Sequence, residues 1–203
     1  MTTTRRMTYD DLMALPEDGG RHELVRGEIR VTPPPKGGHG GVESALDEAI
    51  ARYLYNRATD LGWRAEQGRL ARVRLVGYLA VGEAGMRFSL PDDADQIRAA
   101  DLLYLPPAQF ARAEAALRDE HIPFVPALVT EVVSRTDRPA EVAEKVADYL
   151  AGGARLVWLL HPTMRTVTVH SPDEEPRTIS MGGFLDGGAV LPGFAVPLND
   201  LFL

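Results

Sequence analysis

The order of helical and strand patterns in this chain predicts an α/β protein, with a mixed β-sheet flanked by helices. Apolar residues recur at helical spacing over 42–61, which predicts the longest helix. A second helix is predicted within 134–153, because Pro139 suits a first helical turn and a glycine pair follows the apolar stripe. Apolar runs of strand length over 101–105 and 126–134 lie between them.

The N-terminal part is expected to form a short helix and a hairpin. Thr8 can cap a helix that ends at Pro16, and 22–32 alternates around a turn at Arg26-Gly27. The remaining segments are expected to be a loop over 33–41, strands over 63–76, an ambiguous stretch over 77–97 that could form another hairpin, a helix over 106–120, and strands over 155–162, 166–171, 177–180 and 189–191.

Composition sets limits on the class of protein. A hydrophobic share of 45% and 203 residues suffice for a sizeable core, and no linker is evident. We expect one domain over 1–203, with 1–7 as a short disordered extension. The chain has no cysteine, which excludes disulfides, thiolate catalysis and cysteine-ligated zinc. With no signal-like segment and no membrane-spanning apolar run, the expected location is the cytoplasm.

The net charge of −7 opposes nucleic-acid binding, which usually needs a basic surface. Arg64, Arg69, Arg72 and Arg74 form the only dense basic stretch of the sequence. Because local fields matter more than the total charge, the acidic balance lowers the expectation without excluding DNA.

Glu131 is the residue that points most directly to chemistry. It interrupts the apolar run 127–133, where an ionised carboxylate is costly unless it is paired, hydrogen-bonded or bound to a metal. The alternative is that Glu131 ends the strand and pairs with an arginine. Spacing alone does not decide between the two interpretations.

Asp101 opens another short apolar strand, thirty residues earlier. If the two strands are neighbours, Asp101 and Glu131 could converge on one cation, and oxygen ligands favour Mg²⁺ or Mn²⁺. The alternative is an ordinary aspartate at a strand start. Lys145 lies at the border of the buried face of the second helix, where it could reach inward or pair with Glu141 on the surface.

Two further candidates come from the N-terminal third. His39, at the end of a glycine-rich loop, could be a ligand, a base or a plain loop residue, and Glu23 lies in a predicted strand. The other histidines lack metal-like spacing, which argues against a histidine-rich zinc site. The sequence has no phosphate-binding P-loop, GxGxxG or GxSxG motif.

Taken in order, TYDDLMALPEDGGRHELVRGEI, PPPKGGHGG with the long helix, ADLLYLP, LVTEVVSRTDR and EKVADYLAGGARLVWLLHP resemble the Uma-two family over about residues 7–200. Its members are regarded as restriction endonucleases. The resemblance implies the restriction-endonuclease-like PD-(D/E)XK nuclease fold.

The resemblance also implies roles for individual residues. Asp101 matches the aspartate of the PD motif and Glu131 the acidic residue of the (D/E)XK motif, so the two would hold Mg²⁺ (or Mn²⁺). Val133 replaces the usual lysine, and Lys145 matches the lysine that similar families supply from the following helix. Glu23 and His39 match a glutamate and a histidine of such proteins. The implied activity is metal-dependent hydrolysis of phosphodiester bonds in DNA.

Several alternatives stay open. The proline expected before Asp101 is Ala100, and Asp92 after Pro91 is a rival for the motif aspartate. The protein could instead be a catalytically inactive nuclease-fold protein acting as a binding or regulatory dimer, or a hydrolase of a small phosphorylated molecule. A homodimer could use the apolar segments 155–170 and 191–203, although a core role suits them equally.

Overall fold

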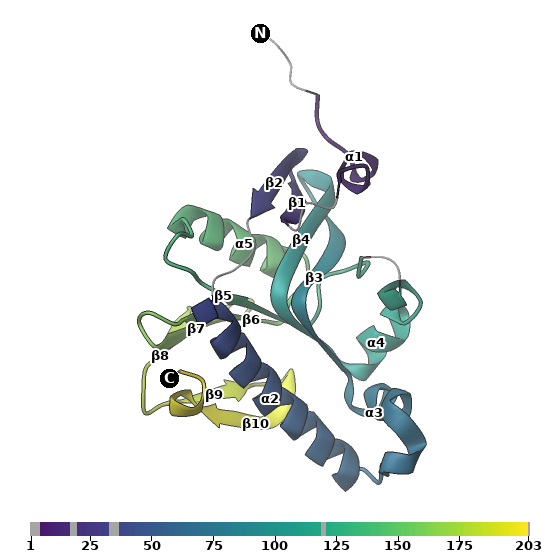
Figure 1. The fold of residues 1–203 in the computed structure, drawn as a ribbon, viewed down its shortest axis with the longest axis vertical. Helices are drawn as coiled ribbons and strands as arrows, with labels where there is room; N and C mark the ends of the chain where they lie inside the picture. The colour runs from purple at the N-terminus through teal and green to yellow at the C-terminus, as the bar shows by residue number, and fades with distance from the viewer. Residues whose placement is uncertain (1–4, 17–19, 33–36, 119–120, 203) are drawn as a thin grey trace.

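The computed structural model describes residues 5–16, 20–32, 37–118 and 121–202, and within these ranges eight strands form one mixed sheet. Their order is β2-β1-β4-β5-β6-β7-β8, with β3 also paired to β4 (Figure 1). Among these described strands, β5 and β6 are the one pair that runs parallel. The strands are β1 Arg21–Val25, β2 Glu28–Thr32, β3 Tyr78–Leu90, β4 Asp93–Leu105, β5 Leu128–Val132, β6 Leu156–His161, β7 Thr166–His170 and β8 Arg177–Ile179.

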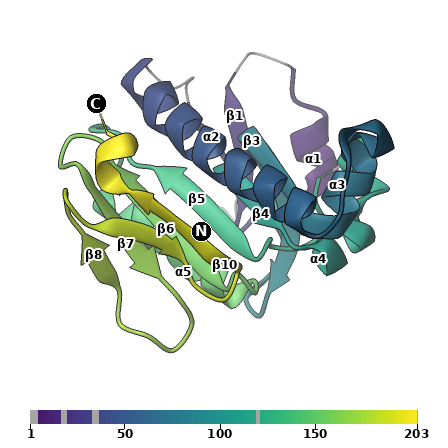
Figure 2. The same cartoon turned by 90° about the horizontal axis from the view of Figure 1, so that it is seen from below.

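Helices cover both faces of this sheet, as Figure 2 shows from below. Helix α2 and a separate hairpin, β9–β10, pack on one face around Trp158, and α4 and α5 pack on the other around Tyr149. These and the remaining elements are α1 Tyr9–Met13, α2 Gly37–Asp60, η1 Ala65–Gln67, α3 Gly68–Val76, α4 Pro107–Ala113, η2 Ala116–Arg118, α5 Pro139–Ala151, β9 Phe184–Gly187, β10 Leu191–Pro197 and η3 Leu198–Asp200.

Helix α5 is the crossover that the parallel pair β5–β6 requires. Pro139 occupies its first turn and Gly152 its C-cap, as the sequence predicts. Val146 and Tyr149 are buried on the side that faces the sheet. This crossover therefore carries Lys145 over the end of β5. The predicted mixed sheet with flanking helices is confirmed, as are the capped first helix and the hairpin at 22–32.

The segment 63–76 is a correction, because it forms η1 and α3 instead of strands. Arginine and apolar residues alternate there, but the buried residues of α3 are Val73 and Val76, three residues apart, which share one face of a helix. The ambiguous segment 77–97 contains the hairpin between β3 and β4, so β4 already begins at Asp93.

Other boundaries also differ from expectation. Helix α2 begins at Gly37, within the predicted loop, so His39 lies in its first turn, and 33–36 lie outside the described residues. Helix α4 ends at Ala113, before a short 3₁₀ turn. Of the extension 1–7, residues 1–4 lie outside the described residues, and in the described part the Met7 amide donates to the Gly27 carbonyl at 2.8 Å.

The two segments considered for a dimer interface contribute to the core. Trp158 and Leu160 of β6 are fully buried, and Phe194 of β10 stacks on Trp158 with ring centroids 5.9 Å apart. The described parts of 155–170 and 191–203 therefore owe much of their apolar character to packing within the chain.

Leu46→Ala is expected to destabilise the protein by about 2–5 kcal/mol, because Leu46 is fully buried where α2 packs on the sheet and its loss leaves a cavity. Urea denaturation measures the free energy of unfolding. Glu48→Ala on the exposed side of the same helix is the control and should change it by less than about 0.5 kcal/mol. Equal effects of the two substitutions would contradict the packing of α2.

Candidate active site

A cleft of about 390 Å³ opens between β2, the end of β5 and the first turns of α5. Its lining combines carboxylates, cations and a few apolar side chains: Arg21, Val31, Thr32, Glu131, Val133, Thr136, Asp137, Arg138, Glu141, Val142 and Lys145.

The cleft lies where two neighbouring strands separate. Pairing between β4 and β5 ends at Leu102 and Thr130, and farther along β4 the strand β1 becomes its neighbour, at Ile97. In the register of β4 and β5, the next residues after Leu102 and Thr130 are Asp101 and Glu131. Asp101 Oδ2 accepts the Val132 amide at 2.6 Å, so a side chain replaces the backbone acceptor at this point.

Asp101 is buried and surrounded by donors. His39 Nε2 lies 3.2 Å from Oδ2, and Arg21 Nη1 lies 3.4 Å from Oδ1. Burial by itself would raise the pKa of Asp101. The hydrogen bonds from His39 and Val132, together with the charge of Arg21, hold that pKa below its ordinary value. Asp101 is therefore ionised at neutral pH.

Glu131, which lines the cleft, has a different environment. The Tyr149 hydroxyl donates to Oε1 at 2.5 Å, and Lys145 Nζ lies 3.2 and 3.3 Å from the two carboxylate oxygens. Burial raises the pKa of Glu131, and the nearby charge of Asp101 raises it further, while Lys145 and Arg21 oppose the shift. The Glu131 carboxylate thus depends on its cationic neighbours to stay ionised.

Lys145 connects Glu23 of β1 with Glu131 of β5. Its ammonium group lies 3.1 Å from Glu23 Oε1 as well as close to Glu131, and it lies 3.5 Å from the Ala99 carbonyl. Tyr149 is one helical turn farther along α5, so both side chains project from the same face. The alternative in which Lys145 pairs with Glu141 is wrong, since Glu141 pairs with Arg138.

Glu23 completes the buried part of the site. It accepts the Ala99 amide at 3.0 Å and lies 3.3 Å from Arg98 Nη1. Burial would raise the pKa of Glu23, but Lys145, Arg98 and the Ala99 amide lower it overall. Arg98 also bonds Asp148 of α5, so buried ion pairs connect β1, β4 and α5.

His39 joins the site from the first turn of α2. The hydrogen bond to Asp101 raises the pKa of His39, which favours the protonated ring. The five residues expected from the sequence lie in two groups that meet at β5. His39 contacts Asp101, while Lys145 contacts both Glu23 and Glu131. The Val132 amide, next to Glu131, bonds Asp101 and so joins the groups. Among the described residues, Asp92 contacts none of the five and lies outside the cleft lining: it is in the turn between β3 and β4, largely exposed and 3.4 Å from Arg26.

Four residues of the site were not anticipated from the sequence: Arg21, Arg98, Asp148 and Tyr149. Arg98 carried the same signal as Glu131, a charge close to an apolar strand. Arg21 and Tyr149 carried none, because each owes its role to a partner far away in the sequence.

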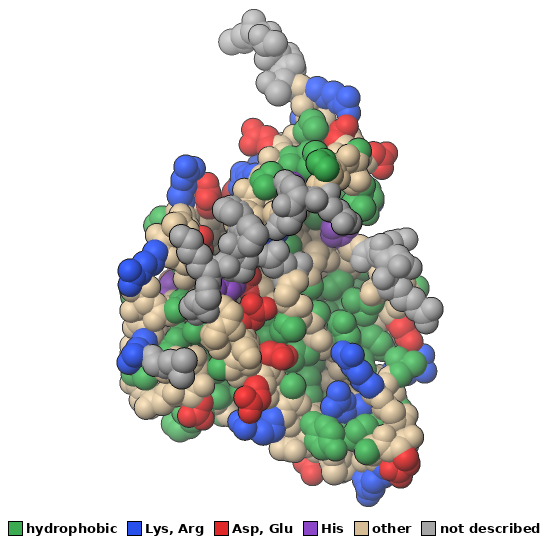
Figure 3. All heavy atoms as spheres, in the orientation of Figure 1, with side chains coloured by type: hydrophobic (Ala, Val, Ile, Leu, Met, Phe, Trp, Pro, Cys, Tyr) green, Lys and Arg blue, Asp and Glu red, His purple; other side chains and the backbone are tan. Residues whose placement is uncertain are grey.

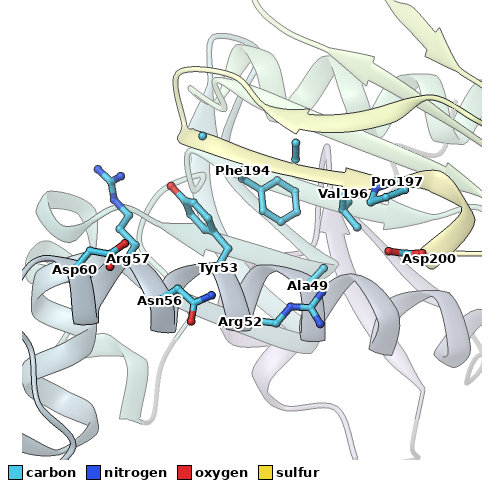
Figure 4. A pocket seen from close by; sticks show the side chains of 12 residues that line it. Ala49, Arg52, Tyr53, Asn56, Arg57, Asp60, Phe194, Val196, Pro197 and Asp200 are labelled. Atoms are coloured by element: carbon cyan, nitrogen blue, oxygen red, sulfur yellow. The ribbon is translucent and has the colours of Figure 1, made fainter.

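Two other hollows contain none of the expected site residues. One lies between α2 and β10, with Tyr53 and Phe194 facing each other in it and Arg52, Arg57, Asp60 and Asp200 around it (Figure 4). The other is lined by Tyr9, Arg87 and His121. Of these three hollows, the cleft beside β5 is therefore the one that contains expected site residues, Glu131 and Lys145.

Residues 9–199 match the model of the Uma2 family, described as "Putative restriction endonuclease". This chain belongs to the Uma2 family. The resemblance seen in the sequence is thereby confirmed. A solved structure described as a "putative nuclease belonging to DUF820" from Anabaena variabilis ATCC 29413 aligns over 96% of this chain and 97% of that one, with a TM-score of 0.72 and 18% identity. At that identity the likeness shows a shared fold alone. No curated protein matches the chain.

The donor chemistry of the Uma2 site fits a hard cation. Within the described ranges, no three acidic or histidine side chains come together as a complete metal site. Mg²⁺ commonly needs only one or two carboxylates, because waters and substrate phosphates supply its other ligands. Asp101 and Glu131, with Glu23 behind them, can provide such a partial set.

Among the described residues, no helix is long and apolar enough to cross a membrane.

Lys145→Met is expected to destabilise the metal-free protein by about 3–5 kcal/mol near pH 8, because two buried carboxylates lose their shared cation. The penalty should shrink toward about pH 5. The pKa of Glu131 in the folded protein is raised above 4.5, its value in the unfolded chain. The stability that Glu131 contributes is therefore present below that value and is lost as the pH rises. Removing the Lys145 ammonium group enlarges this loss.

Urea denaturation in chelator at both pH values measures this effect. Arg138→Met removes a cation that is 80% exposed and should change stability by less than about 1 kcal/mol at either pH. A Lys145→Met penalty that is constant across this range would contradict the dependence of Glu131 on Lys145.

Proposed function

We propose that this Uma2 protein is a metal-dependent endonuclease that hydrolyses phosphodiester bonds in DNA. The observation that carries the proposal is a cleft lined by Glu131 and Lys145, which contact each other. The buried Asp101 adjoins them, because its Oδ2 accepts the Val132 amide next to Glu131. Two carboxylates beside a positioned ammonium group suit attack by water on a phosphodiester.

Asp101 and Glu131 are the residues that would hold Mg²⁺ or Mn²⁺. When bound, the ion supplies polarisation of the phosphoryl group and a lower pKa for an attacking water. Asp101 is already ionised and oriented for this role by the His39 ring and the Val132 amide. Tyr149 and Lys145 together hold the Glu131 carboxylate in one orientation.

Lys145 contributes fixed positive charge for the anionic transition state, and Glu23 keeps its ammonium group beside Glu131. His39 is engaged with Asp101 through Nε2, so its contribution is to orient and ionise this carboxylate. Direct proton transfer by His39 to a leaving group is a less suitable role in this geometry, because Nε2 is engaged with Asp101 and Nδ1 is buried, 3.8 Å from Glu43.

Within the described part of the chain, the cations that line the cleft are Arg21, Arg138 and Lys145. The arginine-rich segment is elsewhere, in and just before α3, and Figure 3 shows basic side chains interspersed with acidic ones at the end of the molecule where α2 meets α3. Helix α2 has 24 residues and is about 36 Å long, and His39 is at its opposite end. Among the described residues, phosphate neutralisation at the point of cleavage therefore depends on the cations that line the cleft.

Asp101→Asn and Glu131→Gln are each expected to reduce Mg²⁺-dependent nicking of supercoiled plasmid by about 100-fold or more, because each removes an anionic ligand. Gel electrophoresis of time courses, with and without EDTA, measures the rate. Asp92→Asn is the matched control and should cleave like the wild type, since Asp92 is remote from the cleft.

Nicking by Asp101→Asn at the wild-type rate would contradict the proposal and indicate a contaminating nuclease. Purified wild-type protein that binds DNA but never nicks it would favour the inactive binding protein. Turnover of a generic phosphodiester without DNA cleavage would favour a small phosphorylated substrate.

A further inference from the structure

Arg21 lies among the carboxylates of the cleft without belonging to the expected catalytic set. It is the first residue of β1, its side chain is 13% exposed, and it lines the cleft. Burial would lower the pKa of its guanidinium, but Glu131, Glu23 and Asp101 together raise it. Arg21 therefore acts as a counter-ion to all three carboxylates.

Its attachment to them is loose. The ion pair with Asp101 spans 3.4 Å, and Nε is buried without a hydrogen-bond partner in the part of the chain that the structure describes. Arg98, on the neighbouring strand, differs: its Nε and one Nη bond Asp148, while the other Nη bonds Glu23. Arg98 is thus held in place, while Arg21 retains unused donor capacity beside the cleft.

We propose that Arg21 takes the place of a cation between Asp101 and Glu131 in the metal-free protein, and binds a substrate phosphate once a divalent ion occupies these carboxylates. This inference rests on the proposed nuclease function and assigns Arg21 a phosphate-binding role in it.

Charge balance supports this exchange. Glu23, Asp101 and Glu131 face Arg21, Lys145 and the protonatable ring of His39. Arg98 also pairs with Glu23, but it is shared with Asp148, which balances its charge. A divalent ion added to this set repels Arg21, and an incoming phosphodiester supplies the anion that Arg21 then lacks. A guanidinium group suits this second role, because its donors match two phosphate oxygens at once.

The proposal predicts effects of opposite sign from one substitution. Arg21→Gln should tighten Mn²⁺ binding by about tenfold, because a competing positive charge is removed. The same variant should cleave DNA at least about tenfold more slowly at saturating metal, because the phosphate loses its guanidinium partner. Isothermal titration with Mn²⁺ alone and plasmid nicking measure the two effects.

Two further variants separate charge from structure. Arg21→Lys retains the charge and should leave Mn²⁺ affinity within about twofold of wild type, while cleavage falls because one ammonium group cannot bind two phosphate oxygens. Arg155→Gln is the matched control, since Arg155 is exposed, precedes β6 and lies outside the cleft lining. It should change neither quantity. Thermal unfolding shows whether each variant is folded.

Unchanged or weaker Mn²⁺ binding in folded Arg21→Gln, with an active wild type, would overturn the role of Arg21 and leave the proposed nuclease intact. Wild-type protein that binds no Mn²⁺ and cleaves no DNA would overturn both. If Arg21→Gln does not fold, wild-type cleavage by Arg21→Lys would still refute the phosphate-binding role.

Discussion

The separation of β4 from β5 is the constraint on which the rest of the site depends. Up to Leu102 and Thr130 the two strands satisfy each other through their backbones, and beyond this pair the Val132 amide needs another acceptor. A buried amide without a partner costs free energy, so the Asp101 carboxylate has a structural reason to be there as well as a chemical one. The same separation leaves room for the cleft and brings Glu131 to its wall.

Buried charge then sets the position of α5 above the sheet. Asp148 accepts hydrogen bonds from Gln96, Arg26 and Arg98, while Lys145, three residues earlier on α5, pairs with Glu23 and Glu131. Apolar packing tolerates small shifts of a helix along its axis, but these directional contacts do not, because a shift would leave charges unpaired in the interior. Helix α5 is thereby held in the register that its Lys145 needs.

The sequence was sufficient to predict the elements that have strong local signals. Pro139 and the glycine pair after Ala151 delimit α5. The charge of Glu131 within an apolar strand pointed to the strand that lines the cleft. The residues of α3 were misassigned because alternation and helical spacing coincide over so short a segment. Arg21 and Tyr149 could not be assigned from the sequence, because their partners are brought to them only by the strand order and by the crossover helix.

The β9–β10 hairpin has a consequence for biosynthesis. The residues of the site, from Glu23 to Tyr149, leave the ribosome before residues 184–202, which cover the sheet beside α2. Until then Trp158 and Leu160, fully buried in the finished fold, lack part of their cover. Nascent chains that pause before this hairpin would present an apolar sheet face to chaperones. The sheet that carries the site is therefore fully covered only after the hairpin has been made, although the site residues themselves are made earlier.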